Sequence, residues 1–156
     1  MNTYIAFRID NDDYGLDLRY VKEVLLAVAI RKIPHSLPFV KGVMNVRGHI
    51  TPVIDLKRLF SNSSSAYSIH SHIVIAQHQE NLLAFIVDEV YDVLTISSEQ
   101  LQKPQQTIPI SSFLDFVGER EGRLLLLLNL PKIMETARLC SVDRALEWQT
   151  QEKIYG

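Results

Sequence analysis

The sequence predicts a mainly β protein whose short strands form a sandwich or a barrel. Apolar and polar residues alternate with a period of two in several short segments. Clusters of turn-forming residues interrupt these segments at intervals of about 8 to 12 residues. This rhythm is typical of antiparallel strands and leaves little room for the crossover helices of a parallel sheet.

The chain length of 156 residues suits one compact domain, or two small subdomains that share a core. Hydrophobic residues make up 47% of the chain and charged residues 22%, which excludes a disordered or collagen-like protein. The longest unbroken apolar run, Val24 to Ile30, is much shorter than the roughly 20 residues of a membrane span. Because the N-terminus lacks a secretory pattern, we expect a cytoplasmic protein without direct membrane insertion.

The N-terminal segment predicts a β-hairpin over residues 4–18, because alternating apolar residues flank an acidic turn. The next segment, 21–28, fits either a helix or a strand, since its apolar residues match both periods. An irregular connector is expected over 33–41, where Pro34 and Pro38 restrict the backbone and remove two donors.

Regular structure is expected to resume near His49, in a strand that Pro52 places at a sheet edge or a bulge. The serine-rich stretch 61–68 predicts a flexible loop and the boundary between two subdomains. Five further strands are expected over residues 69–77, 82–87, 90–96, 113–118 and 123–128.

The C-terminal segment predicts two short helices. Pro131 suits the first position of one helix, and Ser141 can cap the next, with Asp143 in its first turn. We expect the second helix to pack on the barrel.

Basic residues are concentrated between positions 31 and 58, although the whole chain has a net charge of −2. This window contains six basic residues and only Asp55 as an acid, a local charge of +5. It predicts either a solvated basic face or a docking surface for an acidic partner. Nucleic-acid binding is a further alternative, but single-strand binders need stacking aromatics and this window has only Phe39.

No motif in the sequence indicates catalysis or a bound metal or cofactor. His70 and His72 are expected to share one face of a strand, but no third ligand follows at a suitable spacing. Cys140 has no histidine near it in the sequence and is expected to be an inert thiol. We therefore expect no enzymatic activity, no cofactor and no metal site.

The combination of several short motifs resembles the CheW family of chemotaxis coupling proteins. In the first half these motifs are YGLD at 14–17, VKEV at 21–24, KGVMNVRG at 41–48 and PVIDL at 52–56. In the second half they are VDEVYDVL at 87–94 and LLLNL at 126–130. Each motif alone is weak evidence, whereas their order and spacing together are specific to this family.

The resemblance implies two small five-stranded SH3-like β-barrel subdomains with a cleft between them, plus short C-terminal helices. The CheW-like domain would span residues 1–135, with a helical tail over 136–156. The family resemblance also implies a non-enzymatic adaptor at membrane-associated receptor arrays. Its partners would be the cytoplasmic tip of chemoreceptors and the regulatory domain of a CheA-type histidine kinase. An adaptor of another array, such as one that controls type IV pilus twitching, fits the same resemblance.

The resemblance also assigns partner-binding residues, which are Val21, Glu23, Gly42, Asn45, Arg47 and Gly48. For Arg47 we favour binding, because its planar charge can pair with a carboxylate of a partner. Gly42, Asn45 and Gly48 fit turn-shaping roles as well as binding, and Val21 fits both core packing and groove lining.

Overall fold

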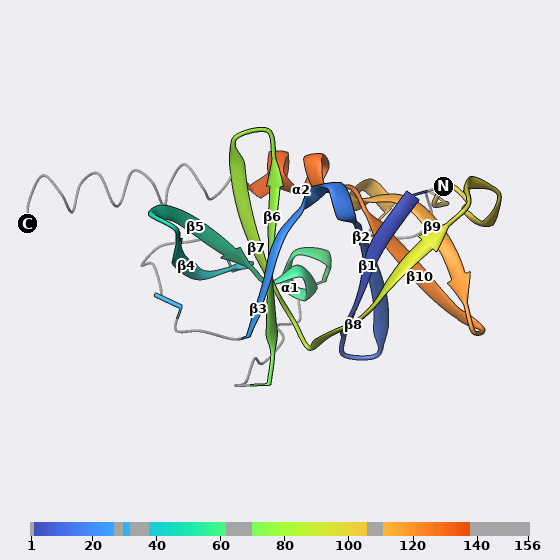
Figure 1. The fold of residues 1–156 in the computed structure, drawn as a ribbon, viewed down its shortest axis with the longest axis horizontal. Helices are drawn as coiled ribbons and strands as arrows, with labels where there is room; N and C mark the ends of the chain where they lie inside the picture. The colour runs from blue at the N-terminus through green and yellow to red at the C-terminus, as the bar shows by residue number, and fades with distance from the viewer. Residues whose placement is uncertain (1, 27–29, 32–37, 62–69, 106–110, 138–156) are drawn as a thin grey trace, which may run out of the picture.

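The computed structural model describes residues 2–26, 30–31, 38–61, 70–105 and 111–137. These residues form two five-stranded sheets that lie side by side (Figure 1). The mainly β fold class with two SH3-like barrels is therefore confirmed. The predicted second C-terminal helix, Cys140 and the tail 136–156, apart from its first two residues, lie outside the described residues.

We call the first sheet barrel 1. Its strand order is β8-β1-β2-β10-β9, and the strands are β1 (Asn2–Ile9), β2 (Asp12–Asp17), β8 (Glu89–Ile96), β9 (Leu114–Arg120) and β10 (Arg123–Leu128). The second sheet, barrel 2, has the order β3-β6-β7-β5-β4, with β3 (Val21–Leu26), β4 (Val40–Val46), β5 (His49–Ile54), β6 (His72–His78) and β7 (Asn81–Val87). Two α-helices follow β5 and β10, namely α1 (Leu56–Phe60) and α2 (Leu130–Ala137). Three single-turn 3-10 helices complete the described elements, at Leu18–Tyr20, Ser98–Gln100 and Ser111–Phe113.

The two barrels repeat one topology. In each, a strand leads to a hairpin whose second strand enters a helix, and another hairpin completes the sheet. In barrel 2 this order follows the chain, whereas in barrel 1 the completing hairpin, β1 and β2, is at the N-terminus. Each barrel has one parallel pair, β5 with β7 in barrel 2 and β10 with β2 in barrel 1.

Both sheets are closed in the same way, by one residue that bridges to the far edge. The backbone of Arg31 exchanges two hydrogen bonds with Val43, of 3.0 and 2.8 Å. In barrel 1, Gln102 exchanges two with Val117, of 2.9 and 2.7 Å. These bridges turn each sheet into a small barrel, because a closed sheet leaves no free edge along the bridged strands.

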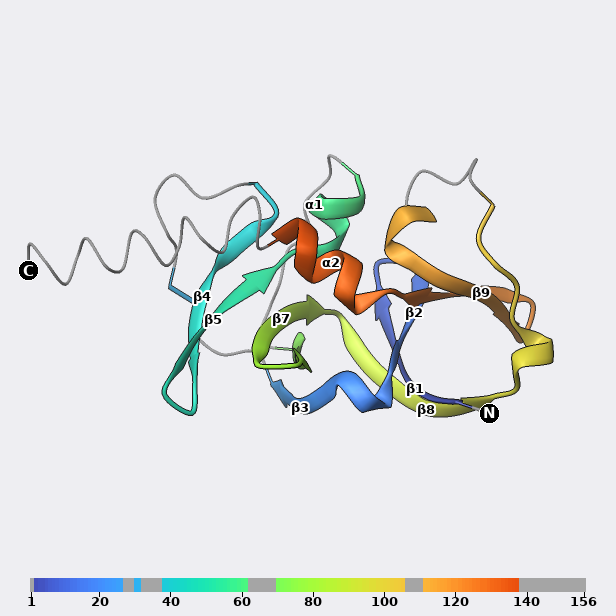
Figure 2. The same ribbon diagram turned by 90° about the horizontal axis from the view of Figure 1, so that it is seen from above.

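The largest hydrophobic cluster lies between the barrels rather than inside either one. It joins Phe7 and Leu16 of barrel 1 to Val74 and Phe85 of barrel 2, all of them fully buried. Helix α2 lies between the two sheets (Figure 2) and adds four buried side chains to the cluster, which are Leu130, Ile133, Met134 and Ala137. The barrels therefore share a core, as expected for a chain of this size.

Several local predictions are confirmed. The hairpin over 4–18 corresponds to β1 and β2, and the short helix at Pro131 corresponds to α2. The ambiguous segment 21–28 forms a strand over its described part, β3, because it pairs with β6 from Val21 to Leu26.

Other local predictions are wrong. Regular structure resumes at Val40 and not near His49, because β4 pairs with β5 in a hairpin. The edge position for Pro52 is wrong, since β5 lies between β7 and β4. The bulge, the alternative in that prediction, lies in the paired strand β4 between Val40 and Gly42, next to the residue opposite Pro52. The proline is tolerated in β5 because the described ladder between β5 and β7 contains only Val53 and Ile54.

The stretch 61–68 does not separate the two subdomains. Most of it lies outside the described residues, but the strands before and after it, β5 and β6, belong to the same barrel. The chain passes between barrels after Asp17 and again after Val87. His70 lies in a turn and only His72 in a strand, so the two histidines do not share one strand face.

Candidate partner-binding site

The structure brings Glu23 of β3 and Arg47 of the β4–β5 turn together. The Arg47 Nε and Nη2 atoms lie 3.4 Å from Glu23 Oε2 and Oε1, respectively. The Arg47 side chain remains 74% exposed and that of Glu23 24% exposed. Because the contact is long and open to solvent, it holds Arg47 only weakly, and the guanidinium is available to a partner.

The tip of this hairpin has the conformation that its sequence favours. Arg47 and Gly48 both have positive φ, of 49° and 86°, as a two-residue hairpin turn requires. The Asn45 Oδ1 atom accepts a hydrogen bond of 2.7 Å from the Gly48 N–H. The turn-shaping role predicted for Asn45 is therefore confirmed, and the turn presents the Arg47 side chain to solvent.

Gly42 is required by the closure of barrel 2. Its φ is +154°, and a Cβ atom at this position would lie 2.2 Å from the Arg31 carbonyl oxygen. No side chain fits there unless the bridge between Arg31 and Val43 moves. The structure therefore supports a structural role for Gly42, which allows the bridge that closes the barrel carrying the site.

Val21 is partly buried and packs against the core between the barrels. The ladder with β6 shifts between Val21 and Glu23, so Val21 lies on the same strand face as Val24, and Glu23 lies on the opposite face. Both readings of Val21, packing and groove lining, fit this position.

Sequence reasoning missed three exposed aliphatic side chains on β3 and β5, the strands that contain Glu23 or follow the turn of Arg47. Val24 is 38% exposed and Leu26 65% exposed on β3, and Ile50 is 40% exposed on β5. The alternation within 21–26 could indicate that Val24 and Leu26 are exposed only once this segment was known to be a strand. Exposed apolar side chains and an exposed charged pair on the same strands and turn match the composition of an interface, with apolar anchors and a polar margin.

Part of the basic window is neutralised within the molecule. Lys41 pairs with Asp55 at 3.5 Å and Lys57 pairs with Asp10, whereas Arg47 is only weakly held by Glu23. Two of these acids come from outside the window, which is why the sequence alone overestimates its net charge. The alternative of a nucleic-acid interface loses support, because free cations are its main source of affinity.

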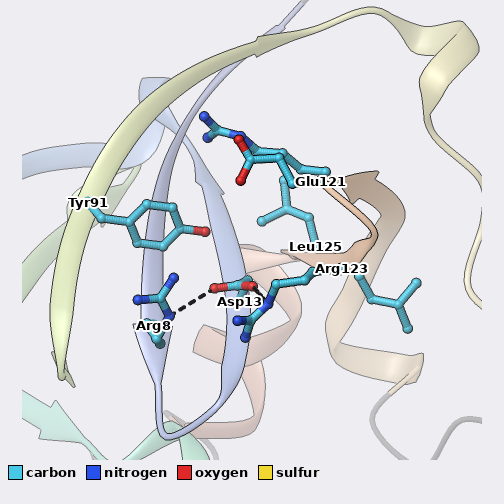
Figure 3. Close-up of a pocket in the computed structure, with 8 residues that line it drawn as sticks. Arg8, Asp13, Tyr91, Glu121, Arg123 and Leu125 are labelled. Atoms are coloured by element: carbon cyan, nitrogen blue, oxygen red, sulfur yellow. Dashed lines mark hydrogen bonds and ion pairs between the residues drawn. The ribbon is translucent and has the colours of Figure 1, made fainter.

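A second charged cluster, which the sequence did not indicate, lies at an open end of barrel 1 (Figure 3). The buried Asp13 carboxylate is 3.2 Å from Arg8 Nε and 2.7 Å from Arg123 Nε. The Arg8 guanidinium lies 4.7 Å from the centre of the Tyr91 ring. Since both carboxylate oxygens are paired, this cluster joins β1, β2 and β10 as a structural ion-pair network.

Among the described residues, no group of three or more histidine, cysteine or acidic side chains could hold a metal ion. No helix in the same part of the chain is long and apolar enough to cross a bilayer.

Two SH3-like barrels on a common core, one of which presents an exposed charged turn, define the class of a small double-barrel scaffold. A family model described as the CheW-like domain matches residues 3–138. The chain therefore belongs to the CheW-like family, and it is a scaffold protein of the chemotaxis type.

Known proteins from several bacteria are similar to the chain over most of its length. It is 28% identical over 142 residues to the chemotaxis protein CheW of Klebsiella aerogenes, which covers 90% of this chain and 86% of the relative. It is 29% identical over 121 residues to the protein PilI of Pseudomonas aeruginosa, which covers 75% and 67%, respectively. Among solved structures, the scaffolding protein CheW of Thermoanaerobacter tengcongensis matches with a TM-score of 0.77, at 31% identity over 83% of this chain and 84% of that one.

Proposed function

We propose that the chain couples chemoreceptors to a CheA-type histidine kinase by binding both, without enzymatic activity of its own. The membership in the CheW-like family supports this role, as does the name of the Klebsiella relative. The observation that carries the proposal is that barrel 2 exposes both Arg47, in the β4–β5 turn, and the aliphatic residues Val24 and Leu26 of β3. We place this adaptor in the cytoplasm, at membrane-associated receptor arrays.

The partner-binding surface is formed by β3 and the β4–β5 hairpin of barrel 2. Receptor tips of this signalling system are helical hairpins, and a helix docks with apolar anchors along a strip and polar contacts at its margin. Val21 and Val24 would supply the strip, and Glu23 and Arg47 the margin. Gly42, Asn45 and Gly48 act by fixing the hairpin that presents Arg47. The binding unit corresponds to residues 1–135, and the tail 136–156 is an addition to it.

The test is the variant Arg47→Glu. It places two carboxylates side by side at positions 23 and 47 and reverses the charge offered to a partner. We expect binding to the receptor or the kinase to weaken about tenfold or more, with the thermal unfolding midpoint nearly unchanged. The measurement is a pull-down with the tagged protein, followed by titration of the partners that are recovered.

The matched control is Glu121→Arg. Glu121 occupies the equivalent hairpin turn of barrel 1, with φ of 53° against 49° for Arg47. This control reverses a turn charge without touching the proposed surface, so it should leave binding unchanged. Unchanged affinity of a stably folded Arg47→Glu protein would contradict the proposal.

A second candidate is the same adaptor role in an array that controls type IV pili. The similarity to PilI of Pseudomonas aeruginosa favours it, although at lower coverage than the similarity to CheW. The kinase and receptor recovered in the pull-down decide between the two arrays, and so does a gene neighbourhood of pilus rather than flagellar genes.

A further inference from the structure

A pocket lies where the β1–β2 turn faces α1. It has a volume of about 360 Å³, and its floor is formed by Ile9, Tyr14, Phe60 and Leu126. This volume is at the lower end of the range for ligand pockets, which is about 300 to 1,000 Å³. The pocket therefore suits one large side chain and its neighbour rather than a whole helix.

The floor of the pocket is aromatic. The ring centres of Tyr14 and Phe60 lie 5.9 Å apart at 31°, and Phe60 contacts Phe113 at 5.6 Å. Phe60 and Leu126 are only partly buried, so they keep apolar surface in contact with solvent. An apolar or aromatic side chain that covered this surface would be stabilised by burial and by ring contacts.

The rim of the pocket is acidic. Asp10 and Asp12 line it, and the Asp88 carboxylate accepts a hydrogen bond of 2.6 Å from the Asp10 N–H. Lys57, which pairs with Asp10, is the one basic residue among the lining residues. Burial, together with Asp12 and Asp10, raises the pKa of Tyr14 to about 12, so the negative potential reaches the floor.

The equivalent place in barrel 2 is filled. Leu83, the third residue of β7, corresponds to Tyr14 in β2, and Met134, the fifth residue of α2, corresponds to Phe60 in α1. Met134 is buried in the shared core whereas Phe60 is only partly buried, and Leu83 is buried as Tyr14 is. The turn beside them carries Gln79 at the position of Asp10 and Asn81 at that of Asp12, with Glu80 between them as its one acid. The open acidic pocket is therefore a property of barrel 1 and is not imposed by the repeated topology.

We propose that this pocket is a docking site for a partner protein that presents an apolar or aromatic side chain next to a lysine or arginine. The acidic rim selects the cation, and the aromatic floor selects its apolar neighbour. Helix α1 lies on the opposite side of the molecule from β3 (Figure 2). The pocket is therefore separate from the surface around Arg47 and can be occupied at the same time.

The test uses three dipeptide probes in a titration of the full-length protein followed by amide chemical shifts. Acetyl-Arg-Phe-amide should bind at millimolar concentration and shift the amides of residues 9–14 and Leu126. Acetyl-Glu-Phe-amide lacks the cation and acetyl-Arg-Ala-amide lacks the ring, so both should bind at least about threefold more weakly. Equal shifts with all three probes, or none at these residues, would overturn the proposal.

The variant Asp12→Asn removes one rim charge while keeping the size of the side chain. It should weaken acetyl-Arg-Phe-amide about threefold and leave acetyl-Glu-Phe-amide unaffected or slightly strengthened. Glu99→Gln, an exposed acid outside the pocket lining, is the matched control and should change neither affinity. Equal effects of the two variants would show that total charge, and not the rim, governs binding. The Arg47→Glu protein should bind the probes like the wild type, which separates this site from the proposed receptor surface.

Discussion

Barrel 1 and barrel 2 use the same topology to build different surfaces. Their hairpin turns have nearly the same conformation, with φ of 49° and 86° at Arg47 and Gly48, and 53° and 77° at Glu121 and Gly122. The tip of the turn, however, is a base in barrel 2 and an acid in barrel 1. The backbone thus repeats while the charge presented to a partner is reversed, which shows that topology sets where the tip lies and the side chain sets what it binds.

Each barrel also has an acid–arginine pair, and the two pairs differ in the distance between their charged groups. Asp92 of β8 and Glu23 of β3 each lie next to a bulge, opposite Ala6 and Ile75. The Asp92 carboxylate is 2.7 Å from an Arg120 nitrogen, whereas Glu23 and Arg47 are 3.4 Å apart. The tighter pair in barrel 1 holds its arginine, and the looser pair in barrel 2 leaves Arg47 to a partner.

The largest effect is expected at the closure of barrel 2. Gly42→Ala brings a Cβ within 2.2 Å of the Arg31 carbonyl oxygen and imposes a strained φ. We expect it to lower the free energy of unfolding by about 4 kcal/mol, as measured by denaturant titration.

Gly118→Ala is the control in barrel 1. Its Cβ would meet the end of the Leu101 side chain at 3.3 Å, and this side chain can move. The loss of stability should be about 1 kcal/mol or less. Similar losses in the two variants would mean that the two bridges are equally tolerant, contrary to the geometry.

The next effect concerns the two helices. Ile133 of α2 is fully buried between the barrels, whereas Phe60 of α1 is only partly buried. We expect Ile133→Ala to lower the free energy of unfolding by about 3 kcal/mol and Phe60→Ala by about half as much. Chemical unfolding of both variants tests this order, and a larger loss at Phe60 would show that α1, not α2, carries the contact between the barrels.

The smallest effect is the pH dependence of the pair in barrel 1. A hydrogen bond from Arg120, followed by one from the Val93 N–H, holds the pKa of Asp92 below its usual 3.8. The folded state therefore binds this proton less readily than the unfolded state, so the pair stabilises the fold above the usual pKa and loses its effect as the pH falls through the lowered one.

Asp92→Asn removes the carboxylate and with it this pH-dependent contribution to stability. Its stability should fall less steeply than that of the wild type as the pH is lowered from about 5 to about 3, as measured by urea midpoints. Glu99→Gln serves again as the exposed control. Parallel profiles for the wild type and Asp92→Asn would show that the 2.7 Å contact contributes nothing to stability in solution.

Much of the fold could be predicted from local patterns. The alternation in 4–18 and the apolar run that follows the turn at Gly122 identified strands, and Pro131 marked the start of α2. The rest depended on distant partners. The segment 21–28 was ambiguous because both periods fit it, and only pairing with β6 made it a strand. For β4, the two prolines before it suggested a connector, while the hairpin with β5 decided its start.

The candidate site could be predicted only as separate residues. Asn45 and Gly48 were recognisable because their interaction is local, within one turn. The contact between Glu23 and Arg47 spans 24 positions along the chain, and the exposed Leu26 is apolar like many core residues. Sequence gives no measure of such distances or of exposure.

Local sequence was enough to predict most of the strands and turns and the resemblance to a family, because periodicity, turn chemistry and motif spacing are properties of neighbouring residues. Only the tertiary structure decided which strands pair, that the barrels repeat one topology with one hairpin moved to the N-terminus, and that Gly42 is needed beside Arg31. It also decided that Lys41 and Lys57 are paired with acids while Arg47 remains exposed. The physical reason is that pairing, burial and ion contacts join residues far apart in the chain, so they exist only once the two barrels have closed and packed together.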